Sequence, residues 1–139
     1  MTGQPFVLHG DFTAAIIDIL SHDSRLTPFN IDVIASDLTS YERGLTYVVV
    51  EMAGGSYKFK ELKRPRIDIT VYAPKRSTAY DISAMCQAIV FSKQGDYKGN
   101  GVNLCACSVE TDIFLASEKD TETLRYTQSL RLVCKPYPG

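Results

Sequence analysis

The 139-residue sequence has no apolar run long enough to cross a membrane and no large excess of either charge. No segment approaches the roughly 18 apolar residues of a spanning helix, and residues 1–10 lack the charged-then-apolar layout of a signal peptide. Fifteen Lys and Arg residues nearly balance 16 Asp and Glu residues, which gives a formal net charge of -1. Such a surface has no general field for a polyanion. We therefore expect a protein that stays in the cytosol where it is made and does not bind DNA as a lone monomer.

The four cysteines do not have the spacing of a structural metal site. Cys105 and Cys107 are separated by one residue, whereas zinc ligands usually come in pairs roughly two to four residues apart on a turn. In a strand both sulfurs would lie on one face, and Cys86 shares a helical stripe with isoleucines. We interpret these thiols, together with Cys134, as small buried residues in a reducing compartment. No metal ion or other cofactor is expected.

Histidines, carboxylates and glycines form no recognisable catalytic set. His22 follows the first expected helix in a polar connection, which is typical of a solvated helix end. Glu110 and Asp112 lie in a hydrophilic stretch and are interpreted as charged surface. The glycines at 54–55 and 95–101 are not followed by the Lys-Ser/Thr pair or the helix start of a phosphate-binding loop. The sequence therefore predicts no enzyme active site.

Apolar residues at helical spacing predict two helices. The first begins near Asp11, and the second covers residues 78–91, with Ser77 or Thr78 as its N-cap. The stripes consist of Phe12, Ala15, Ile16, Ile19 and Leu20 in the first helix, and Ala79, Ile82, Met85, Cys86, Ile89 and Val90 in the second.

Five segments have strand character: residues 29–34, 45–50, 67–72, 102–109 and 124–134. The β-branched run 45–50 is expected in the middle of the sheet. Residues 53–56 are expected to break it, 57–64 to form an exposed hairpin arm, and 92–101 to form a mobile loop. We predict a single α+β domain over residues 1–139, with a largely antiparallel sheet of about five strands and two helices packed on one face. The predicted order is α-β-β-β-α-β-β.

Two segments are candidate contact surfaces. The first is a basic run interleaved with apolar residues: Tyr57, Lys58, Phe59, Lys60, Leu62, Lys63, Arg64 and Arg66. It either protects a sheet edge from stray pairing or binds phosphates or acidic partners. Repeated around a ring, these cations would form a basic collar that guides DNA without reading its sequence. The second is the apolar patch Ile113, Phe114 and Leu115 in the acidic connection 110–122, which could dock on a neighbour.

Three stretches together resemble the tail terminator (tail completion) proteins of long-tailed, siphovirus-type bacteriophages. They are residues 11–20 (DFTAAIIDIL), residues 64–73 (RPRIDITVYA) running into 79–85 (AYDISAM), and residues 125–132 (RYTQSLRL). The resemblance implies a virion protein without catalysis, in a ring that is usually hexameric. Such a ring sits at the head-proximal end of the tail, stops polymerisation of the tail tube and joins the tail to the head.

The partners implied by this resemblance are further copies of the chain, the tail tube protein and the head–tail connector or neck protein. DNA would pass through the ring non-specifically, and no membrane is involved. The candidate contact residues above come from expected exposure and are not family motif positions. Two alternatives remain: another tail-tube or head-closure component, or a small α+β enzyme or ligand-binding module. In the second case Glu110, Asp112, His22 or tyrosines would form a site between subunits.

Overall fold

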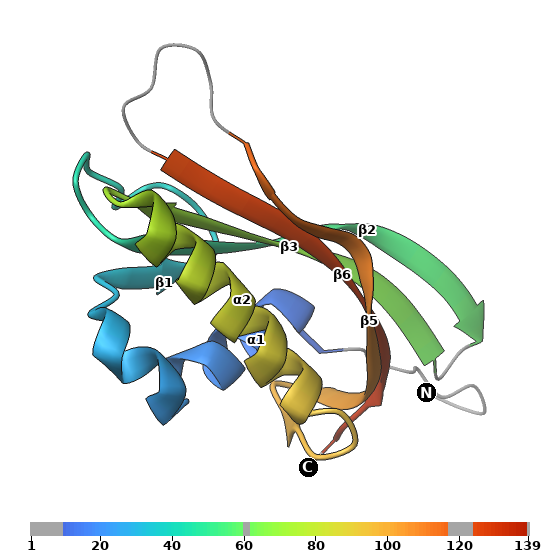
Figure 1. Ribbon diagram of the computed structural model, residues 1–139. Coiled ribbons are helices and arrows are strands. Elements are labelled where there is room, and N and C mark those ends of the chain that lie inside the picture. Colours follow the sequence, from blue (N-terminus) through green and yellow to red (C-terminus); the bar gives the residue numbers. More distant parts are fainter. Residues whose placement is uncertain (1–9, 60–61, 117–123, 139) are drawn as a thin grey trace.

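Six strands form one curved, mixed sheet, and both α-helices pack on the same face of it (Figure 1). The computed structural model describes residues 10–59, 62–116 and 124–138. Its helices are α1 (Phe12–Ser21), the 3-10 helix η1 (Ser24–Phe29) and α2 (Arg76–Ser92). Its strands are β1 (Val33–Ala35), β2 (Tyr47–Phe59), β3 (Leu62–Ala73), β4 (Lys98–Gly99), β5 (Val102–Leu115) and β6 (Leu124–Pro136). The α+β class is confirmed, with one strand and one short helix more than predicted.

The strand order is β1-β2-β3-β6-β5-β4, so β3 and β6 lie at the centre of the sheet. The prediction that β2 is the middle strand is wrong, although residues 47–50 are buried on both faces as expected. Helix α1 covers one of these faces. The other is covered by a loop in which the Tyr41 ring lies 5.6 Å from the Tyr47 ring and the backbone oxygen of Asp37 accepts a hydrogen bond from the Tyr47 hydroxyl.

Both predicted helices are present, and their apolar stripes face the sheet. All five stripe residues of α1 are buried, and the Asp11 side chain caps this helix by accepting a hydrogen bond from the backbone N–H of Ala14. Helix α2 has Lys75 at its N-cap and no side-chain cap. The prediction of Ser77 or Thr78 as the cap is therefore wrong, because the helix begins at Arg76 and both residues already lie within its first turn.

The predicted strand at 29–34 is wrong in its bounds. Pro28 lies inside η1, where its fixed φ is compatible with a helical turn. Asn30 then ends this helix in the left-handed conformation, at φ 51°, and strand pairing begins only at Val33. Strand β1 is parallel to β2, whereas every other neighbouring pair in the sheet is antiparallel.

Strands β2 and β5 are longer than predicted because bulges carry them past their expected ends. Residues 53–56 do not break β2: its register shifts between Met52 and Gly55, and Gly54 has φ 110°. Strand β5 continues to Leu115 through three register shifts. Residues 113–115 therefore lie in a strand and not in a connection. The expected loop 92–101 contains β4, which pairs with the start of β5.

A small polar network lies inside the core between α2 and the sheet. The Gln128 side chain is fully buried, and its Nε2 donates to the backbone oxygen of Ser83 at 2.7 Å and to the Ser83 hydroxyl at 3.2 Å. Gln87 donates to Oε1 of Gln128 at 2.9 Å. Because both ends of the buried amide have partners, Gln128 fixes how α2 sits on β6.

Candidate functional site

The sheet face opposite the helices carries an arginine–carboxylate network. Arg131 on β6 donates from Nε to Oε2 of Glu110 on β5 at 2.9 Å. It also donates from Nη1 to the backbone oxygen of Arg64 on β3 at 2.9 Å. The hydrogen bond from Arg131 lowers the pKa of Glu110, with smaller contributions from the charges of Arg131, Arg66 and Arg64. Three strands of the sheet are thus joined by one side chain.

A second part of this network lies along β3. Arg66 pairs with Asp68 at 3.3 Å, and Asp68 also accepts a hydrogen bond from the Ser129 hydroxyl at 2.6 Å. The Arg64 Nε is buried and has no hydrogen-bond partner in the described part of the chain. Three arginines therefore lie close to two carboxylates, and the exposed Glu51 lies on the same face, opposite Asp68.

The predicted basic run is divided between the two faces of the sheet. Strand alternation places Arg64 and Arg66 on the outer face beside Arg131, whereas Lys63, opposite the buried Cys134, lies on the helix-facing side. Leu62 is partly buried at the start of β3. The backbones of Tyr57, Lys58 and Phe59 lie in β2, and Lys60 lies outside the described residues. The run is therefore not one continuous surface.

The predicted apolar patch is divided in the same way. The Phe114 side chain is 48% exposed, and Phe114 lies opposite Thr127, on the outer face of the sheet. Ile113 and Leu115 are partly buried and pack against the core. Of these three residues, only Phe114 offers a large apolar surface to a neighbour.

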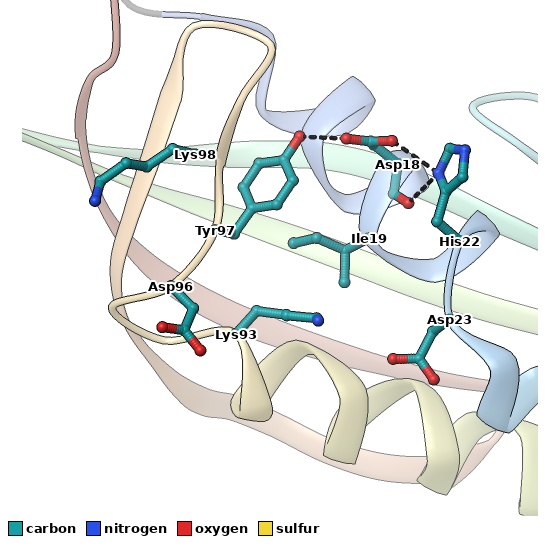
Figure 2. Close-up of a pocket in the computed structure, with 8 residues that line it drawn as sticks. All are labelled: Asp18, Ile19, His22, Asp23, Lys93, Asp96, Tyr97 and Lys98. Atoms are coloured by element: carbon teal, nitrogen blue, oxygen red, sulfur yellow. Dashed lines mark hydrogen bonds and ion pairs between the residues drawn. The ribbon is translucent and has the colours of Figure 1, made fainter. Parts of the chain in front are cut away.

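A hollow of about 270 Å³ lies between the end of α1 and the segment leading into β4 (Figure 2). The Tyr97 hydroxyl donates to Oδ2 of Asp18 at 2.7 Å, and Nδ1 of His22 lies 2.9 Å from Oδ1 of Asp18. Burial and the Asp18 carboxylate raise the pKa of Tyr97 to about 12. The lining residues are Asp18, Ile19, His22, Asp23, Lys93, Asp96, Tyr97 and Lys98.

This hollow is lined by acidic and basic side chains. The phenol of Tyr97 stays protonated at neutral pH, and the His22 side chain is 79% exposed, so solvent screens its contact with Asp18. A catalytic pair needs environments that separate its two pKa values in a site protected from water. We therefore interpret the hollow as a structural feature of the place where the turn before β4 packs against α1.

The chain is similar in structure to known proteins, although no sequence comparison finds a relative. No family model and no curated protein sequence matches the chain. Among solved structures, it is similar to a chain of the virion of a native gene transfer agent (GTA) particle, with a TM-score of 0.66 and 14% sequence identity. The match covers 89% of this chain and 94% of that chain. The shared feature is the fold.

Within one chain, the residues named for the enzyme alternative lie at separate places; the site between subunits that the alternative requires stays a prediction. Glu110 pairs with Arg131 on the outer face, whereas Asp112 accepts a hydrogen bond from Gln87 of α2 at 3.3 Å. His22 lies at the hollow, beside α1. His22 and Tyr97 are joined through Asp18, which both side chains contact.

The cysteines are also arranged differently from the prediction. A bulge between Leu104 and Ala106 interrupts the alternation, so Cys107 is buried opposite Leu132 while Cys105 is partly exposed. Burial raises the pKa of Cys107 to about 12, and a protonated thiol is a poor metal ligand. Within residues 10–59, 62–116 and 124–138, no group of three His, Cys, Asp or Glu side chains is placed to hold a metal ion. In the same ranges, no helix is long and apolar enough to span a membrane.

Sequence reasoning missed the two most specific polar contacts. The pairing of Arg131 with Glu110 depends on the register of β5 against β6, and three bulges shift that register. The contact between Tyr97 and Asp18 joins segments 79 residues apart and has no local signal. The one signal in the sequence for the contact between Glu110 and Arg131 is the opposite charge of the two side chains.

Proposed function

We propose that this chain is a structural virion protein that forms a ring, hexameric as in the family it resembles. The ring would cap a phage-type tail tube at its head-proximal end, stop polymerisation of the tube and join the tail to the connector. The observation that carries the proposal is the fold shared with a GTA virion chain over nearly the full length of both. The order of the three resembling stretches supports the assignment to a terminator among virion proteins.

The distribution of side chains favours assembly over catalysis. On the outer face of the sheet, Arg131 is paired with Glu110 and Arg66 with Asp68, and these pairs stabilise the fold. Phe114 and Met52 are 48% and 54% exposed, although they belong to strands with buried neighbours. Large apolar side chains in such positions are typical of protein–protein contacts. We propose that Phe114 and the arginine face, which is the outer sheet face with Arg64, Arg66 and Arg131, contact the tube or DNA in the lumen.

The proposal is tested by deleting the gene in cells that produce the particle. A terminator controls tube length and head joining, so the deletion is expected to give tails of irregular length and unattached heads. Expression of the wild-type chain from a plasmid should restore joined particles. Tails of normal length joined to heads would contradict the proposal. Complete loss of tails would instead favour a tube component, which is the alternative virion role.

A further inference from the structure

In residues 10–59, 62–116 and 124–138, two long strand edges of the sheet have no neighbouring strand. Strand β1 covers β2 only from Tyr47 to Val49, and β4 covers β5 only at Val102 and Asn103. In the part of the chain that the structure describes, no strand pairs with the outer edge of β2 from residue 50 to 59 or of β5 from residue 104 to 115. Backbone N–H and C=O groups along such an edge are a template for another strand.

The two edges are similar in length and lie on opposite sides of the central pair β3 and β6 (Figure 1). Successive antiparallel pairings from β2 through β3 and β6 to β5 make β2 and β5 run in opposite directions. A second copy placed beside β5 in the same orientation therefore presents its own β2 antiparallel to β5. Antiparallel pairs form straight hydrogen bonds perpendicular to the strands.

Apolar side chains support the same arrangement. On the helix-facing side of the sheet, Met52 lies opposite Ile67, Ile67 opposite Leu130, and Leu130 opposite Val109. The two inner residues of this row are fully buried, whereas Met52 and Val109 are 54% and 42% exposed. They lie at the two edges, so a copy added at either edge would cover one of them and continue the row.

We propose that β2 of one copy pairs with β5 of the next, with Met52 of one chain close to Val109 of its neighbour. This contact uses different surfaces on the two copies, as a closed ring requires. The inference rests on the proposed ring and specifies its subunit interface. Exposed Glu51 and the bulge at Gly54 hinder unregulated pairing of the β2 edge, so a defined register is needed.

Cross-linking tests this pairing directly. Ala53 and Ser108 are exposed and neighbour Met52 and Val109. In a Cys105→Ser background we would prepare the A53C, S108C and A53C/S108C variants and treat each with a short bismaleimide. The double variant should give a ladder of covalent oligomers, and a mixture of the two single variants should give dimers. Each single variant alone should stay monomeric on a denaturing gel, like the control A88C on the exposed side of α2.

The other outcomes separate this inference from the proposed function. Dimers from a single variant alone, in the same yield as from the mixture, would indicate a two-fold contact and overturn the pairing. A protein that sediments as a ring while the double variant stays uncross-linked would overturn the pairing and leave the ring. If the free protein is monomeric, the same variants are cross-linked on assembled tails. A protein that stays monomeric and does not bind tails would refute both.

Discussion

Tyr97 donates its hydroxyl hydrogen to the Asp18 carboxylate at 2.7 Å and thereby ties the segment before β4 to α1. The side chain of Asn100 donates to the same phenol oxygen at 2.8 Å. Nearby, the backbone N–H of Asp11 donates to the Asn100 carbonyl at 3.1 Å. Helix α1 and the β4 turn are therefore held together by a side-chain hydrogen bond from Tyr97 and a backbone hydrogen bond from Asp11.

Replacing Tyr97 with Phe removes the hydroxyl and keeps the ring. We expect the free energy of unfolding to fall by about 1.5–3 kcal/mol at neutral pH, as for other hydrogen bonds to charged groups. Because the folded protein raises the pKa of Tyr97 from 10.0 to about 12, the wild type should lose this advantage as the pH rises through that range. Urea unfolding near pH 7 and near pH 12 checks this. An equal difference in unfolding free energy between wild type and variant at both pH values would contradict this explanation.

Gln128 provides a test of the buried network. Gln128→Leu keeps the approximate volume but leaves the Gln87 donor without its closer partner, so we expect a loss of about 1–3 kcal/mol in unfolding free energy. Gln128→Glu places a carboxylate against the Ser83 carbonyl and should cost more at pH 7. Burial raises the pKa of such a glutamate, so this variant should gain stability relative to Gln128→Leu as the pH falls toward 5. Equal pH dependence of the two variants would refute this explanation.

The contact between Asp23 and Arg25 is expected to weaken in acid. The hydrogen bond from the Arg25 side chain, 2.7 Å away, lowers the pKa of Asp23 from 3.8 to about 2. A carboxylate with a lowered pKa stabilises the fold above its ordinary pKa and loses that effect as the pH falls through its folded value. Asp23→Asn keeps a side-chain oxygen as cap. This variant should have a lower free energy of unfolding than the wild type near pH 6. The difference between the two proteins should shrink toward pH 2, as measured by urea unfolding. A deficit that grows on acidification would contradict the assignment.

Charge reversal tests the arginine face. Arg66→Glu combined with Arg131→Glu would replace the two arginines that now pair with Asp68 and Glu110 by carboxylates, on a face that also carries Glu51. If this face contacts DNA or an acidic partner, we expect at least about a tenfold drop in the yield of joined particles. Lys75→Glu, on an exposed residue at the start of α2, is the matched control. Circular dichroism of the isolated variants checks that they fold, and a folded double variant with normal particle yield would refute a role for this face.

The elements with unbroken periodicity were predictable from the sequence. The stripe from Phe12 to Leu20 and the alternation from Ile67 to Val71 both occur in the structure, because each element keeps one period along its length. The predictions for β2 and β5 were wrong where these strands contain bulges. Gly54 carries β2 through a segment that looks like a break, and an extra residue near Cys105 alters which cysteine faces the core. A single inserted residue exchanges the two faces of a strand, and no composition rule locates it.

The candidate contact surfaces were predictable in part. Arg66 and Arg131 were recognisable as cations on strands, but their shared face follows from the pairing of β3 with β6. The uncovered edges of β2 and β5 depend on where β1 and β4 end, and both of these strands are only two or three residues long. Strands that short have too few residues for a periodic signal.

Imaging of tails that carry labelled protein tests the central claim most directly. The chain would be fused to a small tag, and purified particles would be examined by electron microscopy with a tag-specific gold label. The account predicts one ring of label per particle, at the junction of tail and head, and unlabelled tubes below it. Label spaced along the tube, or particles free of label, would contradict a terminator ring.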